Sequence, residues 1–223
     1  PQPSSNLALW LRSDYGVTSS SGAISQWSDF SGQGNNATQS TGSAQPTLTT
    51  GAVNSAILPA VSFNGTSQQL NLPSGFANLT NGASIFVVTK PTSSTATGDP
   101  CAFGNASNSD AVFSQTVGKN ASLNAWNGTT SSSVATTTSP LSNSAYQLLE
   151  EILLPGATAG TATGTIWVNG SQKVQATNLQ NLNNVSRTQN VVGCGIGGTN
   201  FFQGGIAEIL VFSTALSASQ RAS

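Results

Sequence analysis

Turn signals interrupt this chain about every ten residues, and the segments between them are short and rich in β-forming residues. Residues 84–90 read Ser-Ile-Phe-Val-Val-Thr-Lys and are stopped by Pro91, while residues 122–126 and 206–212 are further strong strand segments. Residues 146–154 are apolar on both phases, as expected for a central strand that is covered on both faces. This spacing is typical of a sandwich or barrel. We therefore predict an all-β fold, an antiparallel two-sheet β-sandwich.

A few local signals refine this organisation. Asn169 and Gly170 separate two strand segments and are the dipeptide that a type I′ hairpin prefers. Only residues 217–222 read as a short C-terminal helical turn, with Ser217 as its N-cap. Residues 1–6 are predicted to be a linker, and residues 7–223 the sandwich. The Ser/Thr-rich segments 92–99 and 128–140 are predicted to be loops.

Charged residues are scarce. The chain has 6 Lys and Arg and 7 Asp and Glu in 223 residues, or 6%, where roughly 25% is usual. Ser, Thr, Asn and Gln fill the surface instead. Nucleic-acid binding requires a cationic footprint, which six scattered residues do not supply. There is also no apolar run of about 20 residues that could insert into a membrane.

Several segments, in their order and spacing, resemble a known family. Residues 9–14 read LWLRSD, residues 27–38 WSDFSGQGNNAT, residues 60–65 AVSFNG and residues 202–212 FQGGIAEILVF. The set is similar to the bacterial laminin-G-like, concanavalin A-like lectin/glucanase jelly-roll domains, over roughly residues 7–222. The resemblance implies two curved antiparallel sheets with a concave face often used for glycans. It also implies a secreted or cell-surface location, and in some members bound calcium.

No catalytic machinery is visible. The chain has no histidine, so Ser-His-Asp triads and Cys-His dyads lack their base. Retaining glycosidases need two carboxyl groups about 5–5.5 Å apart. The Glu-x-Asp-x-x-Glu pattern of glucanases with this fold is absent, and the adjacent Glu150 and Glu151 would face opposite sides of a strand. We predict that the protein is not an enzyme.

The candidate ligand residues are polar or aromatic side chains on the phase that faces away from the core. Asn124 and Trp126 alternate with core residues in one strand, and Trp167 does so in another. Tyr146 and Glu150 share one phase of the central strand and are added to this predicted sugar site. The alternative for both tryptophans is a second hydrophobic layer beneath a loop, because tryptophan is usually well buried. Trp10 and Trp27 are assigned to the core.

Two further features have alternative interpretations. Asp29 either caps a turn, with Gly32 and Gly34 allowing positive φ, or belongs to a calcium loop. Cys101 and Cys194 are either two buried thiols or one disulfide, and we expect the disulfide, which fits a secreted protein.

The leading functional hypothesis is an extracellular recognition or adhesion module that binds a polysaccharide or cell-surface glycan, without a cofactor other than calcium. The alternative is a self-assembling structural subunit of a surface layer, filament or virus-like particle, because low net charge favours association. An unrecognised glycan-active enzyme is a minor alternative.

Overall fold

The structure is a computed structural model that describes residues 6–53, 58–105, 110–128 and 130–222. These residues form seventeen strands, one short 3-10 turn and one short α-helix. The elements are β1 (Leu7–Arg12), β2 (Val17–Ser20), β3 (Ala23–Trp27), β4 (Ala37–Thr38), the 3-10 turn (Gly42–Ala44), β5 (Thr47–Thr49), β6 (Ala60–Asn64), β7 (Leu70–Leu72), β8 (Ala83–Pro91), β9 (Thr97–Gly104), β10 (Val112–Val117), β11 (Asn120–Asn127), β12 (Thr130–Ala135), β13 (Gln147–Leu154), β14 (Ala162–Val168), β15 (Ser171–Leu179), β16 (Gln189–Val192), β17 (Gln203–Phe212) and α1 (Ala218–Arg221).

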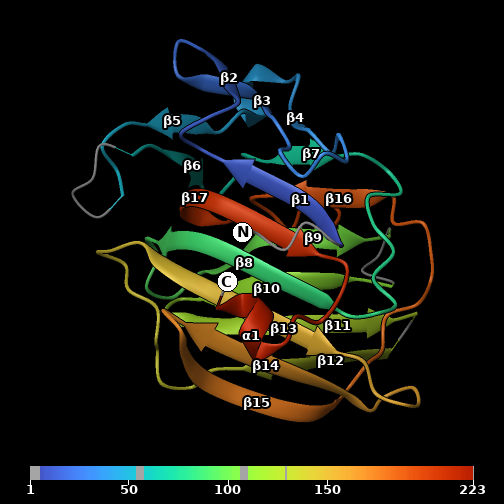
Figure 1. Cartoon of the computed structure of the whole chain (residues 1–223). Helices are drawn as coiled ribbons and strands as arrows, with labels where there is room; N and C mark the ends of the chain where they lie inside the picture. Colours follow the sequence, from blue (N-terminus) through green and yellow to red (C-terminus); the bar gives the residue numbers. More distant parts are fainter. Residues whose placement is uncertain (1–5, 54–57, 106–109, 129, 223) are drawn as a thin grey trace.

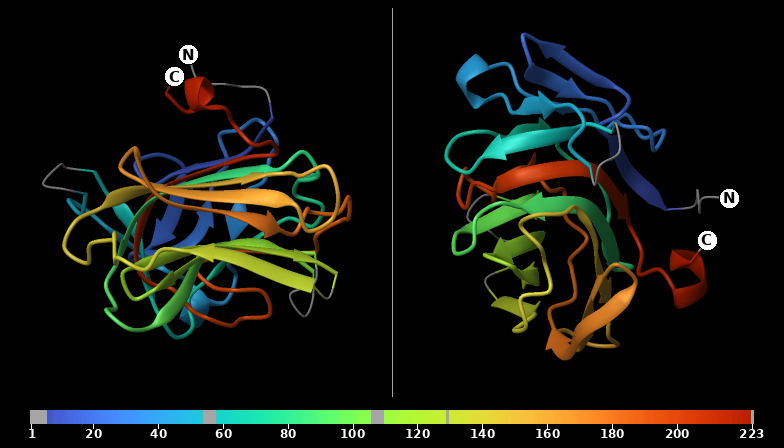
Figure 2. Two further views of the ribbon diagram at one scale, coloured as in Figure 1. Left: turned by 90° about the horizontal axis from the view of Figure 1, so that it is seen from below. Right: turned by 90° about the vertical axis from the view of Figure 1, so that its left-hand side faces the viewer.

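The strands form two main antiparallel layers. In the first sheet, β6 and β1 pair with one edge of β17, and β8, β13, β14 and β15 follow on its other side. The second sheet has the order β7, β16, β9, β10, β11, β12. Figure 1 shows β17, β8 and β13 crossing the middle of the molecule, and Figure 2 (left) shows the two layers stacked, with α1 outside the first sheet. The predicted two-sheet sandwich is confirmed.

The N-terminal strands β2 to β5 close one side of the sandwich. They form a small antiparallel group in which β5 pairs with β6 of the first sheet and β4 pairs with β7 of the second. On the opposite side, β12 and β15 lie in contact. There the amide of Gln180 donates to the Ser132 hydroxyl at 2.7 Å.

Alternating side chains fill the space between the sheets. Ile85 and Val87 of β8 face Leu123 and Ala125 of β11 across one continuous hydrophobic cluster, and all four are fully buried. Burial of apolar surface contributes about 25 cal/mol per Å² to folding, so this cluster is the main source of stability. Residues of the other phase point outward and form the two outer faces of the sandwich.

Local predictions hold where the chemistry is specific. Asn169 and Gly170 have φ of 50° and 72°, as a type I′ turn requires, and Ser217 caps α1 in a capping box with Gln220. The predicted linker, residues 1–6, lies outside the described residues except for Asn6. The loop prediction for residues 92–99 and 128–140 is wrong in part, since β9 begins at Thr97 and β12 spans Thr130–Ala135. Within the described part of the chain β12 pairs with β11 alone, and as an edge strand it can be almost entirely polar.

Candidate functional site

The five predicted ligand residues lie on two opposite outer faces. Asn124 and Trp126 point outward from β11 of the second sheet, because their neighbours in the strand belong to the core. Trp167 points outward from β14 of the first sheet, opposite Glu150 of β13. Tyr146 precedes the same strand, β13. The structure therefore brings these residues together in two groups, and not in one site.

The group on the first sheet is engaged by the C-terminal helix. The guanidinium of Arg221 lies 4.1 Å from the ring centroid of Trp167 and forms an ion pair with Glu150 at 2.9 Å. The side chains of Arg221 and Glu150 are only 12% and 6% exposed. Trp167 thus packs beneath the C-terminal segment, which corresponds to the alternative of a second covering layer. A groove of about 430 Å³ remains beside it, lined among others by Thr165, Gln172 and Gln175.

Tyr146 is also packed. It is 5% exposed, and the ammonium of Lys90 lies 5.0 Å from its ring centroid. Burial raises the pKa of the phenol. A side chain on Gly205 would collide with the Tyr146 hydroxyl, so the ring is seated on a glycine of β17. Its position favours a structural role.

Trp126 and Asn124 are the predicted residues that stay partly exposed on the second sheet. Trp126 packs, together with Phe201, against a second hydrophobic cluster on this outer face. The amide of Asn124 donates to the carbonyl and the hydroxyl of Ser122 at 3.3 and 3.2 Å. This strand surface combines an aromatic ring with amide and hydroxyl groups.

A loop between β16 and β17, residues 193–202, covers the second cluster. Its anchor is Asp99, which is 2% exposed. The backbone amide of Asp99 donates to the Asn200 carbonyl at 2.9 Å, and its carboxyl group accepts from Gln115 Nε2 at 2.8 Å and from Asn200 Nδ2 at 3.4 Å. Burial raises the pKa of Asp99 to about 7, although both amide hydrogen bonds lower it.

A pocket of about 460 Å³ opens between this loop and the paired strands β7 and β16. We call it the amide pocket, and its lining residues are Gln69, Asn71, Leu72, Thr188, Gln189, Asn190, Val191, Gly197 and Gly198. Gln69 Nε2 donates to Asn71 Oδ1 at 3.0 Å, and Gln69 Oε1 accepts from the Cys194 thiol at 3.1 Å. The amides of Gln69 and Asn71 thus form the floor of the pocket, and these hydrogen bonds fix their orientation.

Two features of the amide pocket point to a ligand. Gln189 Oε1 is buried and has no hydrogen-bond partner among the described residues. Leaving a buried acceptor unpaired costs about 1–3 kcal/mol, and a rotation of the Gln189 side chain that exposes Oε1 to a ligand hydroxyl would offset this cost. Gly198, with φ of 71°, leaves an open wall, because a Cβ there would lie 3.9 Å from both Gln69 Oε1 and the ring of Phe201. Uncharged amides beside an aromatic ring suit a ligand rich in hydroxyl groups.

Among the described residues, Asp14 and Glu208 line one pocket together, but both are already engaged, Asp14 by Arg12 and Glu208 by the Trp10 indole. Glu150 faces outward and Glu151 lies in the core with 0% exposure, so their predicted opposite orientation is confirmed. Burial raises the pKa of Glu151 well above its ordinary value, which favours the uncharged form. Its carboxyl oxygens and the Ser114 hydroxyl have no hydrogen-bond partner among the described residues.

Asp29 is the hub of its loop. Oδ1 accepts from the amides of Trp10 and Ser31, both at 2.9 Å, and Oδ2 accepts from the Ser31 hydroxyl at 2.7 Å and the Asn35 amide at 2.8 Å. Gly32 and Gly34 have positive φ, as the turn alternative expects. Four donors surround the carboxylate, so this donor set does not fit calcium, which needs oxygen ligands. The described residues also contain no group of three potential acidic, His or Cys ligands.

The predicted disulfide is not present in the structure. Cys101 and Cys194 are both buried free thiols. Cys101 belongs to the core between the sheets, whereas Cys194 belongs to the cluster on the outer face of the second sheet. The two side chains thus belong to hydrophobic clusters on opposite faces of one sheet, and the sequence offered no means of seeing this.

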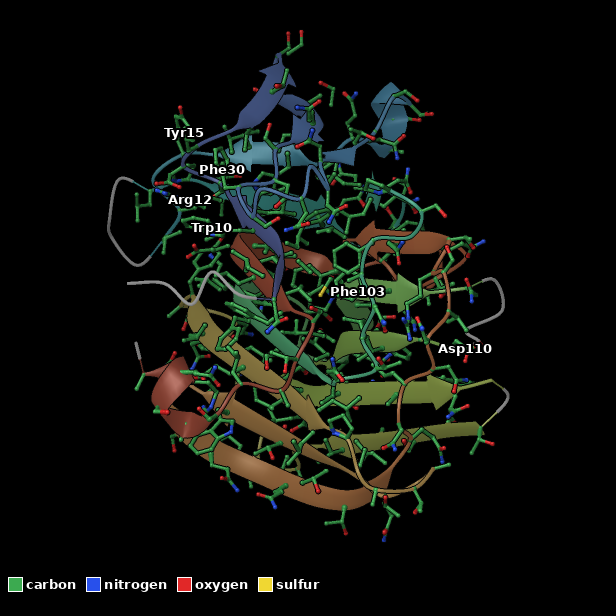
Figure 3. All side chains as sticks on the ribbon, turned by 45° about the vertical axis from the view of Figure 1, so that its right-hand side comes forward. Trp10, Arg12, Tyr15, Phe30, Phe103 and Asp110 are labelled. Carbon is green, nitrogen blue, oxygen red and sulfur yellow. The ribbon has the colours of Figure 1, made fainter. Side chains whose placement is uncertain are left out.

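The tryptophans of the N-terminal region differ. Trp27 is 0% exposed and lies in the core, as predicted. Trp10 is only partly buried, on the outer face of the first sheet. Its indole donates to Glu208 at 2.7 Å and packs edge-on against Phe30, with the rings 6.3 Å apart. Figure 3 shows Trp10, Arg12, Tyr15 and Phe30 gathered beside the N-terminal strands.

The described part of the chain includes no helix with the length and apolar character needed to cross a membrane.

Residues 64–220 match the family described as the concanavalin A-like lectin/glucanases superfamily. Comparison with curated proteins gives no match. Among solved structures, the chain is similar to domain 4 of an extracellular GH43 arabinanase from Geobacillus stearothermophilus, in complex with arabinotriose. The identity is 18%, the TM-score 0.63, and 96% of each chain is covered.

Two further structures share the fold. The CBM40 module of a Ruminococcus gnavus IT-sialidase is 11% identical, with a TM-score of 0.52, over 68% of this chain and 93% of that one. The binding domain of a paraclostridial mosquitocidal protein is 15% identical, with a TM-score of 0.63, over 96% of this chain and 50% of that one.

Proposed function

Because the chain belongs to the concanavalin A-like lectin/glucanase superfamily, we propose that it is a non-catalytic module that binds carbohydrate. The proposed site is the outer face of the second sheet. The observation that carries this proposal is the amide pocket, with its unpaired buried acceptor on Gln189 and the open wall at Gly198.

The surface of the same sheet extends the proposed site. Trp126 and Asn124 lie on this face, on the far side of the loop that Asp99 anchors. The structural relatives support the ligand class, since the arabinanase domain was solved with arabinotriose and the sialidase module with sialyllactose. An extracellular location accords with the extracellular arabinanase.

The non-catalytic role is supported by the placement of the acids. Glycoside hydrolysis needs two carboxyl groups on either side of one bond. Glu150 is paired with Arg221 on one outer face, Glu151 is enclosed in the core, and Asp99 is buried beneath its loop. Incubation with polysaccharides followed by product analysis tests this, and release of oligosaccharides would contradict it.

The binding proposal is tested with a glycan array followed by calorimetry on the best ligand. Gln189→Ala removes the unpaired acceptor, so binding should weaken about 10-fold, the effect of losing one hydrogen bond to a ligand. Gln172→Ala, on the outer face of the first sheet, is the matched control and should bind like the parent protein. Absence of binding to any glycan, or equal weakening in both variants, would overturn the proposed site.

Self-association is less well supported. Large exposed hydrophobic side chains among the described residues are Tyr15, Leu58, Val117 and Leu154. Val117 belongs to the second sheet, Leu154 to the first, and the other two to N-terminal loops. They do not form one common patch, which is what a stable protein interface usually presents.

A further inference from the structure

We propose that the amide pocket selects neutral sugar residues and rejects sugars that carry a carboxylate or a sulfate. This inference rests on the proposed carbohydrate binding and specifies its ligand class. It follows from the chemistry of the lining and of the charges around it.

The lining has no cation. Its polar side chains are amides and one hydroxyl, contributed by Gln69, Asn71, Thr188, Gln189 and Asn190. An amide can donate to one sugar hydroxyl and accept from another, so neutral sugars can satisfy it. An anion entering the pocket would lose hydration, and this cost is offset only where a cation pairs with it.

The nearest buried cation is directed elsewhere. Arg187 is two residues before Gln189, but its side chain is fully buried and does not line the pocket. Its Nε donates to the Asp110 carbonyl at 2.9 Å, and its Nη2 to the Asn183 carbonyl at 3.3 Å. Two of its three nitrogens thus bind the loops that precede β10 and β16, and Nη1 is buried without a partner among the described residues.

The acid beside the pocket's loop is Asp99, which is ionised only above its pKa of about 7. Asp99 lies under the loop that supplies Gly197 and Gly198, and the Cβ of any residue at position 195 would touch its Oδ2. Burial raises the pKa of Cys194 to about 12, and the charge of Asp99 adds to the rise. The Cys194 thiol in turn donates to Gln69 of the pocket floor. An ionised Asp99 would repel an anionic sugar.

The test is an array that presents neutral glycans beside their sialylated, uronic-acid and sulfated counterparts. We expect the strongest ligands to be neutral, and their affinity to change less than about twofold between about 50 and about 500 mM salt, because screening acts on charges. If the strongest ligands are acidic, this inference fails while the proposed function stands. If no glycan binds, both fail.

A charge variant localises the effect. Gln189→Lys should weaken binding of the neutral ligand by about 10-fold and increase retention of acidic glycans, because it places a cation at the pocket. Gln172→Lys adds the same charge to the outer face of the first sheet and should do neither. Thermal denaturation verifies that both variants are folded. An unchanged neutral affinity in Gln189→Lys would overturn the assignment of selectivity to this pocket.

Discussion

The side chain of Asp29 ties its own loop together and links that loop to β1. Its carboxylate accepts hydrogen bonds from the amides of Trp10, Ser31 and Asn35, so Asp29→Ala would leave donors without their partner. We expect the free energy of unfolding to fall by about 2–4 kcal/mol, measured by urea denaturation, since hydrogen bonds to charged groups are the stronger class.

Asp14 provides the control for this prediction. Its carboxylate pairs with Arg12 at 2.7 Å, and the side chains of Asp14 and Arg12 are 34% and 38% exposed. Exposed pairs contribute about 0–1 kcal/mol, so Asp14→Ala should change stability little. Equal losses in the two variants would show that Asp29 is not the hub of its loop.

Side-chain alternation made several of these residue assignments predictable. The inward phase of Leu123 and the outward phase of Trp126 follow from the period of two in a strand, and the structure has both. The turn at Asp29 was foreseeable from the glycines that follow it. The position of the Cys194 side chain could not be foreseen, because Cys194 lies in a loop whose path is set by Asp99 and Asn200.

The helix α1 is too short to be stable alone, so its position depends on tertiary contacts. Arg221 provides two of them, the ion pair with Glu150 and the stack on Trp167. Arg221→Ala would leave the carboxylate of Glu150 largely buried without its partner. We expect a loss of about 1–3 kcal/mol in the free energy of unfolding and a red shift of tryptophan emission as Trp167 becomes solvated.

Arg221→Ala is best compared with Lys173→Ala on β15. Lys173 is exposed, and among the described residues its ammonium has one polar contact, with the Ser171 hydroxyl at 3.2 Å. Its removal should leave both stability and fluorescence unchanged. If Arg221→Ala also leaves the emission spectrum unchanged, α1 does not cover Trp167 in solution.

At the scale of elements, the sequence pattern does not show which strands pair with one another. Alternation assigns a residue to the inner or outer face of its strand, but it does not say which sheet the strand joins. β11 joins the second sheet and β14 the first, so Trp126 and Trp167 separate. The amide pocket was missed for the same reason, since the pairing of β7 with β16 is what places Gln69 and Gln189 along one pocket.

At the scale of the whole molecule, two buried acids govern the pH dependence of stability. Burial raises the pKa of Asp99 from 3.8 to about 7, and raises the pKa of Glu151 well above its ordinary value. The folded protein therefore keeps protons that the unfolded chain releases. The free energy of unfolding should fall as the pH rises from about 4 to about 7, by up to about 4 kcal/mol for Asp99 alone.

Urea denaturation across this pH range tests the prediction. Asp99→Asn should flatten the part of the profile below about pH 7, because an amide does not titrate. Glu151→Gln should reduce the remaining slope. A parent protein whose stability rises with pH over this interval would show that neither acid is protonated in the folded state.

The pairing of the first and last strands has a mechanical consequence. Leu7 at the start of β1 lies opposite Phe212 at the end of β17. The segments before β1 and after β17 therefore leave this antiparallel pair at the same end. A force that pulls these two segments apart would first detach α1. It would then break the hydrogen bonds between β1 and β17 one after another. Because the bonds break one at a time, the force needed to separate β1 from β17 in this geometry is low. The strands of the second sheet lie outside the line of pull, so the amide pocket would deform last.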